Sequence, residues 1–205
     1  MANKDIRLFF IGDSFVNGVC DEEYLGWVGR LCGQSRQPGV ELTCYNLGVR
    51  GNSTEDIAAR WETECRLRVN EDAMNKLVFS YGVNDTVILN GERRVSEVNS
   101  IDISRRILTS ASSRYDVVFI GPPPIDDTEQ NLTIAGIDQS LARLCNELAI
   151  PYLSVFEYLI SNNVWMREVH SNDGAHPGAA SYQLMADYIY EWDEWKHFCR
   201  GQVHN

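Results

Sequence analysis

Five short apolar runs alternate with longer amphipathic stretches along most of the chain. The runs are rich in β-branched and aromatic residues and lie at residues 6–11, 41–47, 77–81, 117–120 and 151–155. Between them, apolar residues recur at helical spacing in residues 24–34, 54–69, 96–113 and 132–148. Such alternation of strands and helices is typical of parallel βαβ units. We therefore expect an α/β fold with about five mainly parallel strands.

The C-terminal part of the chain predicts one further helix. Pro177 is expected to lie at its start, because proline is favoured in the first helical turn. Apolar residues follow at helical spacing through Trp192, and Trp195, His197 and Phe198 can extend the same helix. Because the chain contains no internal repeat, low-complexity segment or linker, we expect residues 1–205 to form a single domain.

Net charge and hydropathy narrow the range of partners. The chain has 205 residues, with 18 Lys+Arg against 29 Asp+Glu and a net charge of −11. This charge repels polyanions and no basic run is present, so nucleic acid is not expected as a partner. The first apolar run is broken by Arg7 and is too short for a signal peptide, and no stretch approaches the length of a membrane span. We expect a cytoplasmic protein without stable membrane insertion; the sequence does not indicate its oligomeric state.

The cysteines do not form a recognisable metal or disulfide pattern. None of them belongs to a Cys-x-x-Cys pair, which argues against a zinc ribbon and against a small disulfide framework. Reduced thiols are the simplest interpretation of these six residues: Cys20, Cys32, Cys44, Cys65, Cys145 and Cys199.

A serine follows the first apolar run at the point where a strand should turn into a helix. In Gly12-Asp13-Ser14, the Ser14 hydroxyl would lie at the carboxyl end of a strand and at the positive end of a helix, where open α/β sheets bind ligands. Asp or Ser is also favoured as a helix N-cap, and the triplet alone fits that role better. A nucleophile would further require a base, an orienting carboxylate and oxyanion donors.

One histidine has a carboxylate at a suitable spacing. The chain contains His170, His176, His197 and His204, and Asp173 precedes His176 by three positions. An aspartate that accepts from Nδ1–H would fix the tautomer and leave Nε2 to take a proton from Ser14. An Asp-Gly turn with His176 merely beside it is the structural alternative. His170, Asp173 and His176 also have the composition of a two-histidine, one-carboxylate metal site.

Two further loops can supply oxyanion donors. Gly51 follows the second predicted strand, and its backbone N–H could approach a substrate without obstruction by a side chain. Asn84 follows the third predicted strand and carries a carboxamide. Each loop alone fits an ordinary glycine-containing turn. Together with Ser14 and the Asp173–His176 segment, however, they can converge on one edge of a parallel sheet.

Four segments of the chain resemble the SGNH hydrolases, also called the GDSL esterase/lipase family. The matching segments are Gly12-Asp13-Ser14-Phe15, Asn46-x-Gly48-x-x-Gly51, Gly82-x-Asn84-Asp85 and Asp173-x-x-His176-Pro177. The resemblance implies a three-layer α/β/α sandwich of flavodoxin-like type and a metal-free mechanism with catalytic Ser14, His176 and Asp173. It also implies an oxyanion hole formed by the Ser14 N–H, the Gly51 N–H and the Asn84 side chain. Phe15 departs from the family leucine, so altered packing behind Ser14 is expected.

These observations lead to a functional hypothesis. We expect a serine hydrolase that cleaves small or short-chain carboxylic esters through an acyl-enzyme, with no cofactor or metal. The sequence leaves two alternatives: a non-enzymatic small-ligand-binding module of flavodoxin-like fold, and a metal-dependent enzyme that uses His170, Asp173 and His176. The sequence does not identify the physiological ester.

Overall fold

A five-stranded parallel sheet forms the centre of the computed structural model, which describes residues 4–200. Its strands are β1 (Lys4–Gly12), β2 (Val40–Gly48), β3 (Met74–Ser80), β6 (Asp116–Ile120) and β7 (Tyr152–Leu153). Their order, β2-β1-β3-β6-β7, is that of flavodoxin-like folds, so the expected strand number and direction are confirmed. Strand β2 lies on one side of β1, whereas β3 and the strands that follow it are added on the other side, so the strand order reverses between β1 and β3. In such sheets, ligands bind at the carboxyl ends of the strands beside this switch point.

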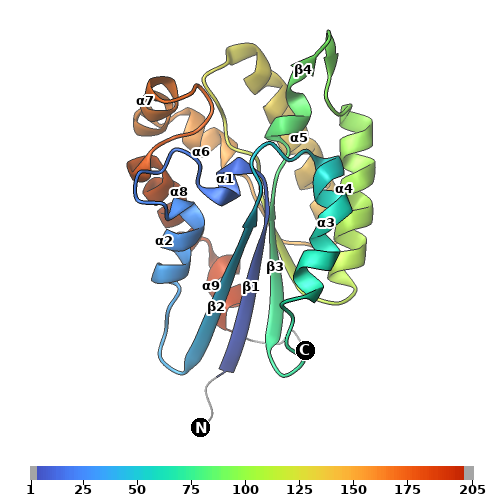
Figure 1. Ribbon diagram of the computed structural model, residues 1–205, viewed down its shortest axis with the longest axis vertical. Coiled ribbons are helices and arrows are strands. Elements are labelled where there is room, and N and C mark those ends of the chain that lie inside the picture. Colours follow the sequence, from blue (N-terminus) through green and yellow to red (C-terminus); the bar gives the residue numbers. More distant parts are fainter. Residues whose placement is uncertain (1–3, 201–205) are drawn as a thin grey trace.

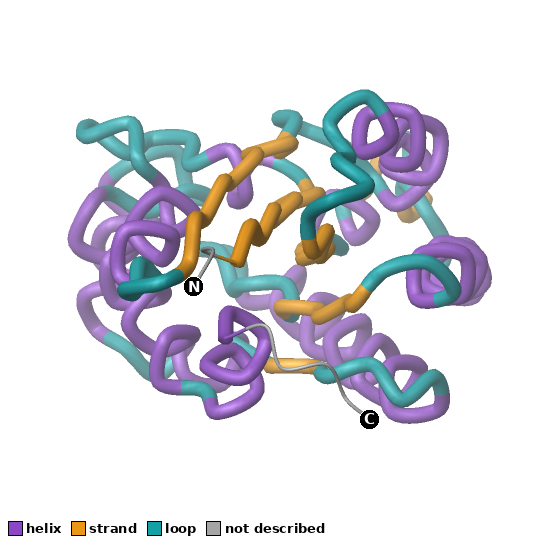
Figure 2. Tube along the Cα trace, turned by 90° about the horizontal axis from the view of Figure 1, so that it is seen from below, coloured by secondary structure: helices purple, strands orange, loops and turns teal. Residues whose placement is uncertain are grey.

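Helices cover both faces of the sheet (Figure 2). They are α1 (Ser14–Asn17), α2 (Gly26–Gln34), α3 (Thr54–Arg66), α4 (Glu97–Ser112), α5 (Thr128–Glu147), α6 (Phe156–Ile160), α7 (Asn163–Ser171), α8 (Ala179–Glu191) and α9 (Asp193–Arg200), with the 3₁₀ helix η1 (Val83–Thr86). Helices α2 and α8 lie on one side of β1 and β2, whereas α3 and α4 lie on the other (Figure 1). None of the described helices combines the length and apolar character needed to cross a membrane.

Alternating side chains of β1 fill the two apolar clusters that hold the layers together. Leu8 and Phe10 belong to the cluster beneath α2 and α8, whereas Phe9 and Ile11 belong to the cluster beneath α3 and α4. All four side chains are fully buried. A strand buried on both faces reads as a continuous apolar run, which explains the pattern in the sequence. The expected three-layer arrangement is confirmed.

The C-terminal helix differs from its prediction in two ways. It begins at Ala179 rather than at Pro177, after Gly178 as N-cap. A carboxylate from α7, Glu168, accepts hydrogen bonds from the backbone N–H groups of Gly178 and Ser181, each at 3.0 Å, and so satisfies this helix end. The helix does not continue through Trp195, because Trp192 adopts an extended conformation with ψ 126° and a separate helix, α9, follows.

The polar turn at residues 90–94 belongs to a short hairpin of β4 (Ile88–Leu89) and β5 (Glu92–Arg93). Asn90 and Gly91 have positive φ angles of 54° and 86°, as a type I′ turn requires. The hairpin projects beyond the carboxyl ends of the strands (Figure 1).

Candidate active site

The Ser14 turn is built from close backbone packing at the end of β1. A Cβ atom on Gly12 would lie 2.0 Å from the Ser80 carbonyl oxygen, so only glycine fits there. Asp13 is the N-cap of α1, and its Oδ1 accepts a hydrogen bond of 3.0 Å from the Phe15 N–H. Ser14 is the first residue of α1 and is 3% exposed. Since Asp13 caps the helix, the Ser14 hydroxyl is not needed for that role.

The α7–α8 loop places an aspartate against the imidazole of His176. Oδ1 of Asp173 accepts from the backbone N–H groups of Ala175 and His176 at 3.1 and 2.8 Å, and its Oδ2 lies 2.8 Å from Nδ1 of His176. Burial alone would raise the pKa of Asp173, but the backbone and ring of His176 lower this pKa to about 2. The carboxylate is therefore ionised at neutral pH and fixes the ring orientation.

The other ring nitrogen of His176 has no hydrogen-bond partner within residues 4–200. Its Nε2 is buried, and the whole side chain is only 9% exposed. A hydrogen bond between Ser14 and Nε2 is thus not formed in this structure, although such contacts often tighten only when substrate binds. Phe15 packs beside the imidazole, with ring centroids 5.0 Å apart. The residue that departs from the family leucine therefore contacts the candidate base.

Gly51 lies in a tight turn that follows β2. The Asn52 N–H donates to the Val49 carbonyl at 3.2 Å, and Gly51 has φ +80°, as the third position of a type II turn requires. An arginine that follows the β4–β5 hairpin, Arg94, donates to the Gly51 carbonyl at 2.6 Å and holds the turn from outside.

Asn84 links the loops that follow three different strands. From η1, its Nδ2 donates to the Asn52 carbonyl at 3.0 Å and to Oδ2 of Asp13 at 3.3 Å. Both amide hydrogens of Asn84 are therefore engaged. To donate to a substrate, Asn84 would have to give up its longer hydrogen bond, the one to Asp13. The neighbouring Asp85 is fully buried and accepts from the Thr54 N–H at 2.8 Å, which ties η1 to the start of α3.

An arginine on α3 braces two of these loops, and no sequence motif indicated it. Nε of Arg60 donates to Oδ1 of Asn52 at 2.6 Å, and its NH2 group donates to the Gly12 carbonyl at 2.8 Å. Arg60 thus fixes the turn before Ser14 relative to the turn that contains Gly51.

The structure does not support the predicted metal alternative. His170 Nδ1 lies 2.6 Å from Oδ2 of Asp126, on an exposed part of α7, and not beside the other two candidates. Within the described residues, the group with metal-ligand spacing consists instead of Cys20, Asp173 and His176. The proposed set of His170, Asp173 and His176 is therefore wrong, because α7 directs His170 towards a different carboxylate.

The remaining histidines do not join this site. His197 lies on α9 and lines a cavity near Asp116, at the amino end of β6 and thus opposite the Ser14 edge of the sheet. His204 lies outside the described residues.

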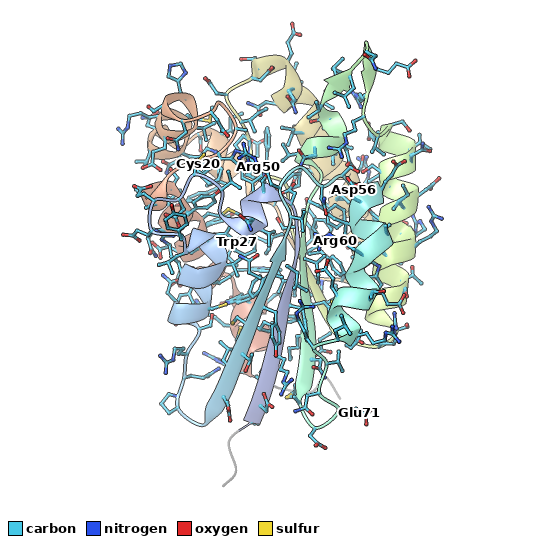
Figure 3. The ribbon with its side chains drawn as sticks, in the orientation of Figure 1. Cys20, Trp27, Arg50, Asp56, Arg60 and Glu71 are labelled. Carbon is cyan, nitrogen blue, oxygen red and sulfur yellow. The ribbon has the colours of Figure 1, made fainter. Side chains whose placement is uncertain are left out.

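Two neighbours of Asp173 carry no signal in the sequence. Sγ of Cys20 lies 3.8 Å from Oδ2 of Asp173, and the guanidinium of Arg50 lies 3.5 Å from the same oxygen. Cys20 and Arg50 lie close together near the carboxyl ends of the strands (Figure 3). Their distance from Asp173 along the chain hid this proximity.

Buried Asp13 predicts a pH-dependent loss of stability. Burial, reinforced by the charge of Asp85, raises the pKa of Asp13 from 3.8 to about 7. The folded state then binds more protons than the unfolded state between these values, so the free energy of unfolding falls as pH rises from 4 to 7. At about 1.4 kcal/mol per pKa unit, the loss is on the order of 4 kcal/mol. Asp13→Asn keeps a capping oxygen but cannot ionise.

Urea unfolding of both proteins across this pH range tests the effect. Relative to wild type, Asp13→Asn should gain stability as pH rises, and the difference should level off above the pKa of Asp13. If the difference in the free energy of unfolding between the two proteins stays constant with pH, the pKa of Asp13 is not raised in the folded state.

Comparisons with known proteins agree with the fold. The model of the GDSL-like lipase/acylhydrolase family matches residues 10–184. A lipase/acylhydrolase from Enterococcus faecalis is 19% identical, with a TM-score of 0.76 and coverage of 97% of this chain and 99% of the other. An acetylxylan esterase from Geobacillus stearothermophilus is 16% identical, with a TM-score of 0.72 and coverage of 98% and 96%. No curated protein gives a significant match.

Proposed function

Because the chain belongs to the GDSL-like lipase/acylhydrolase family, and is therefore an ester hydrolase, we propose that Ser14, His176 and Asp173 form its catalytic triad. One observation carries this proposal: Asp173 holds Nδ1 of His176 at 2.8 Å, while the buried Nε2 has no hydrogen-bond partner among the described residues. An imidazole oriented in this way is poised to accept a proton. Family membership also removes the alternative of a non-enzymatic binding module.

In the proposed reaction, Oγ of Ser14 attacks the ester carbonyl carbon while Nε2 of His176 takes the hydroxyl proton. The tetrahedral intermediate collapses, and His176 returns this proton to the departing alkoxide, which leaves as the alcohol. Water then attacks the acyl carbon while His176 takes a proton from it, and His176 returns this proton to Oγ of Ser14 as the carboxylic acid is released. Asp173 stays ionised and stabilises the imidazolium throughout.

The oxyanion would accept hydrogen bonds from the Ser14 N–H, the Gly51 N–H and Nδ2 of Asn84. Asn84 can supply its donor by giving up the 3.3 Å contact to Asp13 while it keeps the 3.0 Å bond to Asn52. The turn contacts of Gly51 and the brace from Arg60 support a preorganised hole, in which each donor contributes about 3 kcal/mol to the stabilisation of the transition state.

The proposed substrates are small or short-chain acyl esters. A charged side chain borders Asp173: the guanidinium of Arg50 lies 3.5 Å from its carboxylate, and this side chain is 68% exposed. A cationic group beside the triad would have to be desolvated by a long acyl chain placed over it, which supports a preference for small acyl groups.

Two measurements on the purified protein test this proposal. Hydrolysis of p-nitrophenyl acetate, butyrate and octanoate should give a kcat/KM that falls roughly tenfold or more towards octanoate, since little apolar area is buried. A fluorophosphonate probe should label the peptide that contains Ser14, and His176→Ala should lose most of this label.

The same assays distinguish the outcomes. Heat-denatured protein serves as the control for nonspecific labelling. A label on another serine, or activity abolished by a chelator and restored by a metal ion, would overturn the serine mechanism. A higher kcat/KM for octanoate would instead overturn only the proposed substrate class.

A further inference from the structure

We propose that Cys20, Asp173 and His176 form an inhibitory site for a thiophilic divalent cation such as Zn²⁺. The loss of activity that we expect rests on the proposed function, because it acts through the triad. Binding of the cation does not, because it depends only on the three ligands.

The positions of the ligand atoms fit such an ion. One atom from each of the three residues lies within 4.8 Å of the others. Bond lengths of about 2.0–2.3 Å place neighbouring ligands of tetrahedral zinc roughly 3.3–3.6 Å apart. Sγ of Cys20 is 3.8 Å from Oδ2 of Asp173, close to this spacing, and His176 Nδ1 at 2.8 Å from the same oxygen would need to move outward by roughly 0.5 Å.

Contacts on both sides fix the backbone of the loop that carries Cys20. Cys20 has a φ of 67°, which is unusual for a residue with a side chain. The next residue, Asp21, accepts from the Gly26 N–H at 2.6 Å and pairs with buried Arg30, so the loop is closed on one side. On the other side, the Tyr182 hydroxyl donates to the Val19 carbonyl at 2.9 Å. Because this backbone is already ordered, the loop loses little conformational entropy when its thiol binds an ion.

The charges also favour a cation at this position. A Cys20 thiolate and the Asp173 carboxylate together neutralise a divalent ion, and a thiolate combined with an imidazole suits zinc. The guanidinium of Arg50 competes for Asp173 at 3.5 Å, but it is 68% exposed and can turn into solvent.

Metal coordination would block the base through its tautomer. The cation displaces the thiol proton of Cys20 into solvent and takes the lone pair of His176 Nδ1. The imidazole proton must then reside on Nε2, the buried atom that has no partner among the described residues. A protonated Nε2 cannot accept the hydroxyl proton of Ser14, so acylation stops.

Inhibition by buffered Zn²⁺ in the p-nitrophenyl acetate assay tests the site. We expect wild type to be inhibited reversibly, with activity restored by EDTA. Measured relative to its own metal-free activity, Cys20→Ser should need a Zn²⁺ concentration for half-inhibition that is roughly tenfold higher or more, since one strong ligand is lost. Cys44→Ser, a change on β2 away from the three ligands, is the matched control and should respond as wild type does.

Direct binding is measured separately with Co²⁺ and Ser14→Ala. A thiolate-to-cobalt absorption band should appear with this variant and be absent when Cys20→Ser is added. Equal Zn²⁺ sensitivity of wild type and Cys20→Ser, or no cobalt band that depends on Cys20, would overturn the proposal. If Ser14→Ala instead retained full ester hydrolysis while the cobalt band persisted, the proposed triad would fail and the cation site would remain.

Discussion

Ser14→Ala is expected to lower kcat for p-nitrophenyl acetate by roughly a millionfold, the size of the loss when a serine protease loses its nucleophile. Without Oγ no acyl-enzyme can form, and the remaining rate reflects only substrate binding and the oxyanion donors. The fold should persist, because Asp13 rather than Ser14 caps α1 through its contact to the Phe15 N–H. Single-turnover kinetics, with active-site titration of wild type, measure the effect.

The control for this change is Ser161→Ala, which removes an exposed hydroxyl at the end of α6. It should leave kcat unchanged, and thermal unfolding should show that both variants are folded. If a Ser14→Ala preparation that the fluorophosphonate probe does not label kept more than a small fraction of the wild-type rate, another group would be the nucleophile.

The parts of this fold that the sequence predicts are those governed by local rules. The strand β1 is buried on both faces, so its apolar run is continuous and easily recognised. The Asn90-Gly91 turn is specified by backbone conformation alone. In contrast, the break between α8 and α9 at Trp192 lies where the helical spacing of apolar residues continues in the sequence, so this spacing does not predict it. The acidic residues Asp193 and Glu194 that follow were the available signal, because they favour a helix start.

The site shows a similar division between local and distant contacts. Asp173 and His176 could be paired from the sequence, because a spacing of three positions within one turn brings their side chains together. The contact between Cys20 and Asp173 joins residues 153 positions apart, and the brace from Arg60 to Gly12 joins residues 48 apart. Neither spacing carries a sequence signal, so only packing of α2, α3 and α8 around the sheet creates these contacts.

Asp173→Asn is expected to lower kcat roughly ten-thousandfold, as the same change does in a serine protease triad. Asparagine keeps an oxygen for the backbone N–H groups of Ala175 and His176, so the loop should hold its shape. The amide would then face Nδ1 of His176 with its NH₂ group. This contact favours the tautomer with a proton on Nε2, which cannot deprotonate Ser14, and the charge that stabilises the imidazolium is lost.

Another Asp–His pair, Asp126 with the exposed His170, provides the control. Asp126 lies 2.6 Å from Nδ1 of His170, and Asp126→Asn removes a similar carboxylate next to the same loop. Only Asp173→Asn should reduce kcat, with KM changed little, because the orienting carboxylate acts on proton transfer rather than on substrate binding. Near-normal turnover of Asp173→Asn would remove Asp173 from the triad. Equal losses in both variants would instead attribute the effect to disturbance of the α7–α8 loop, and would equally contradict the assigned role.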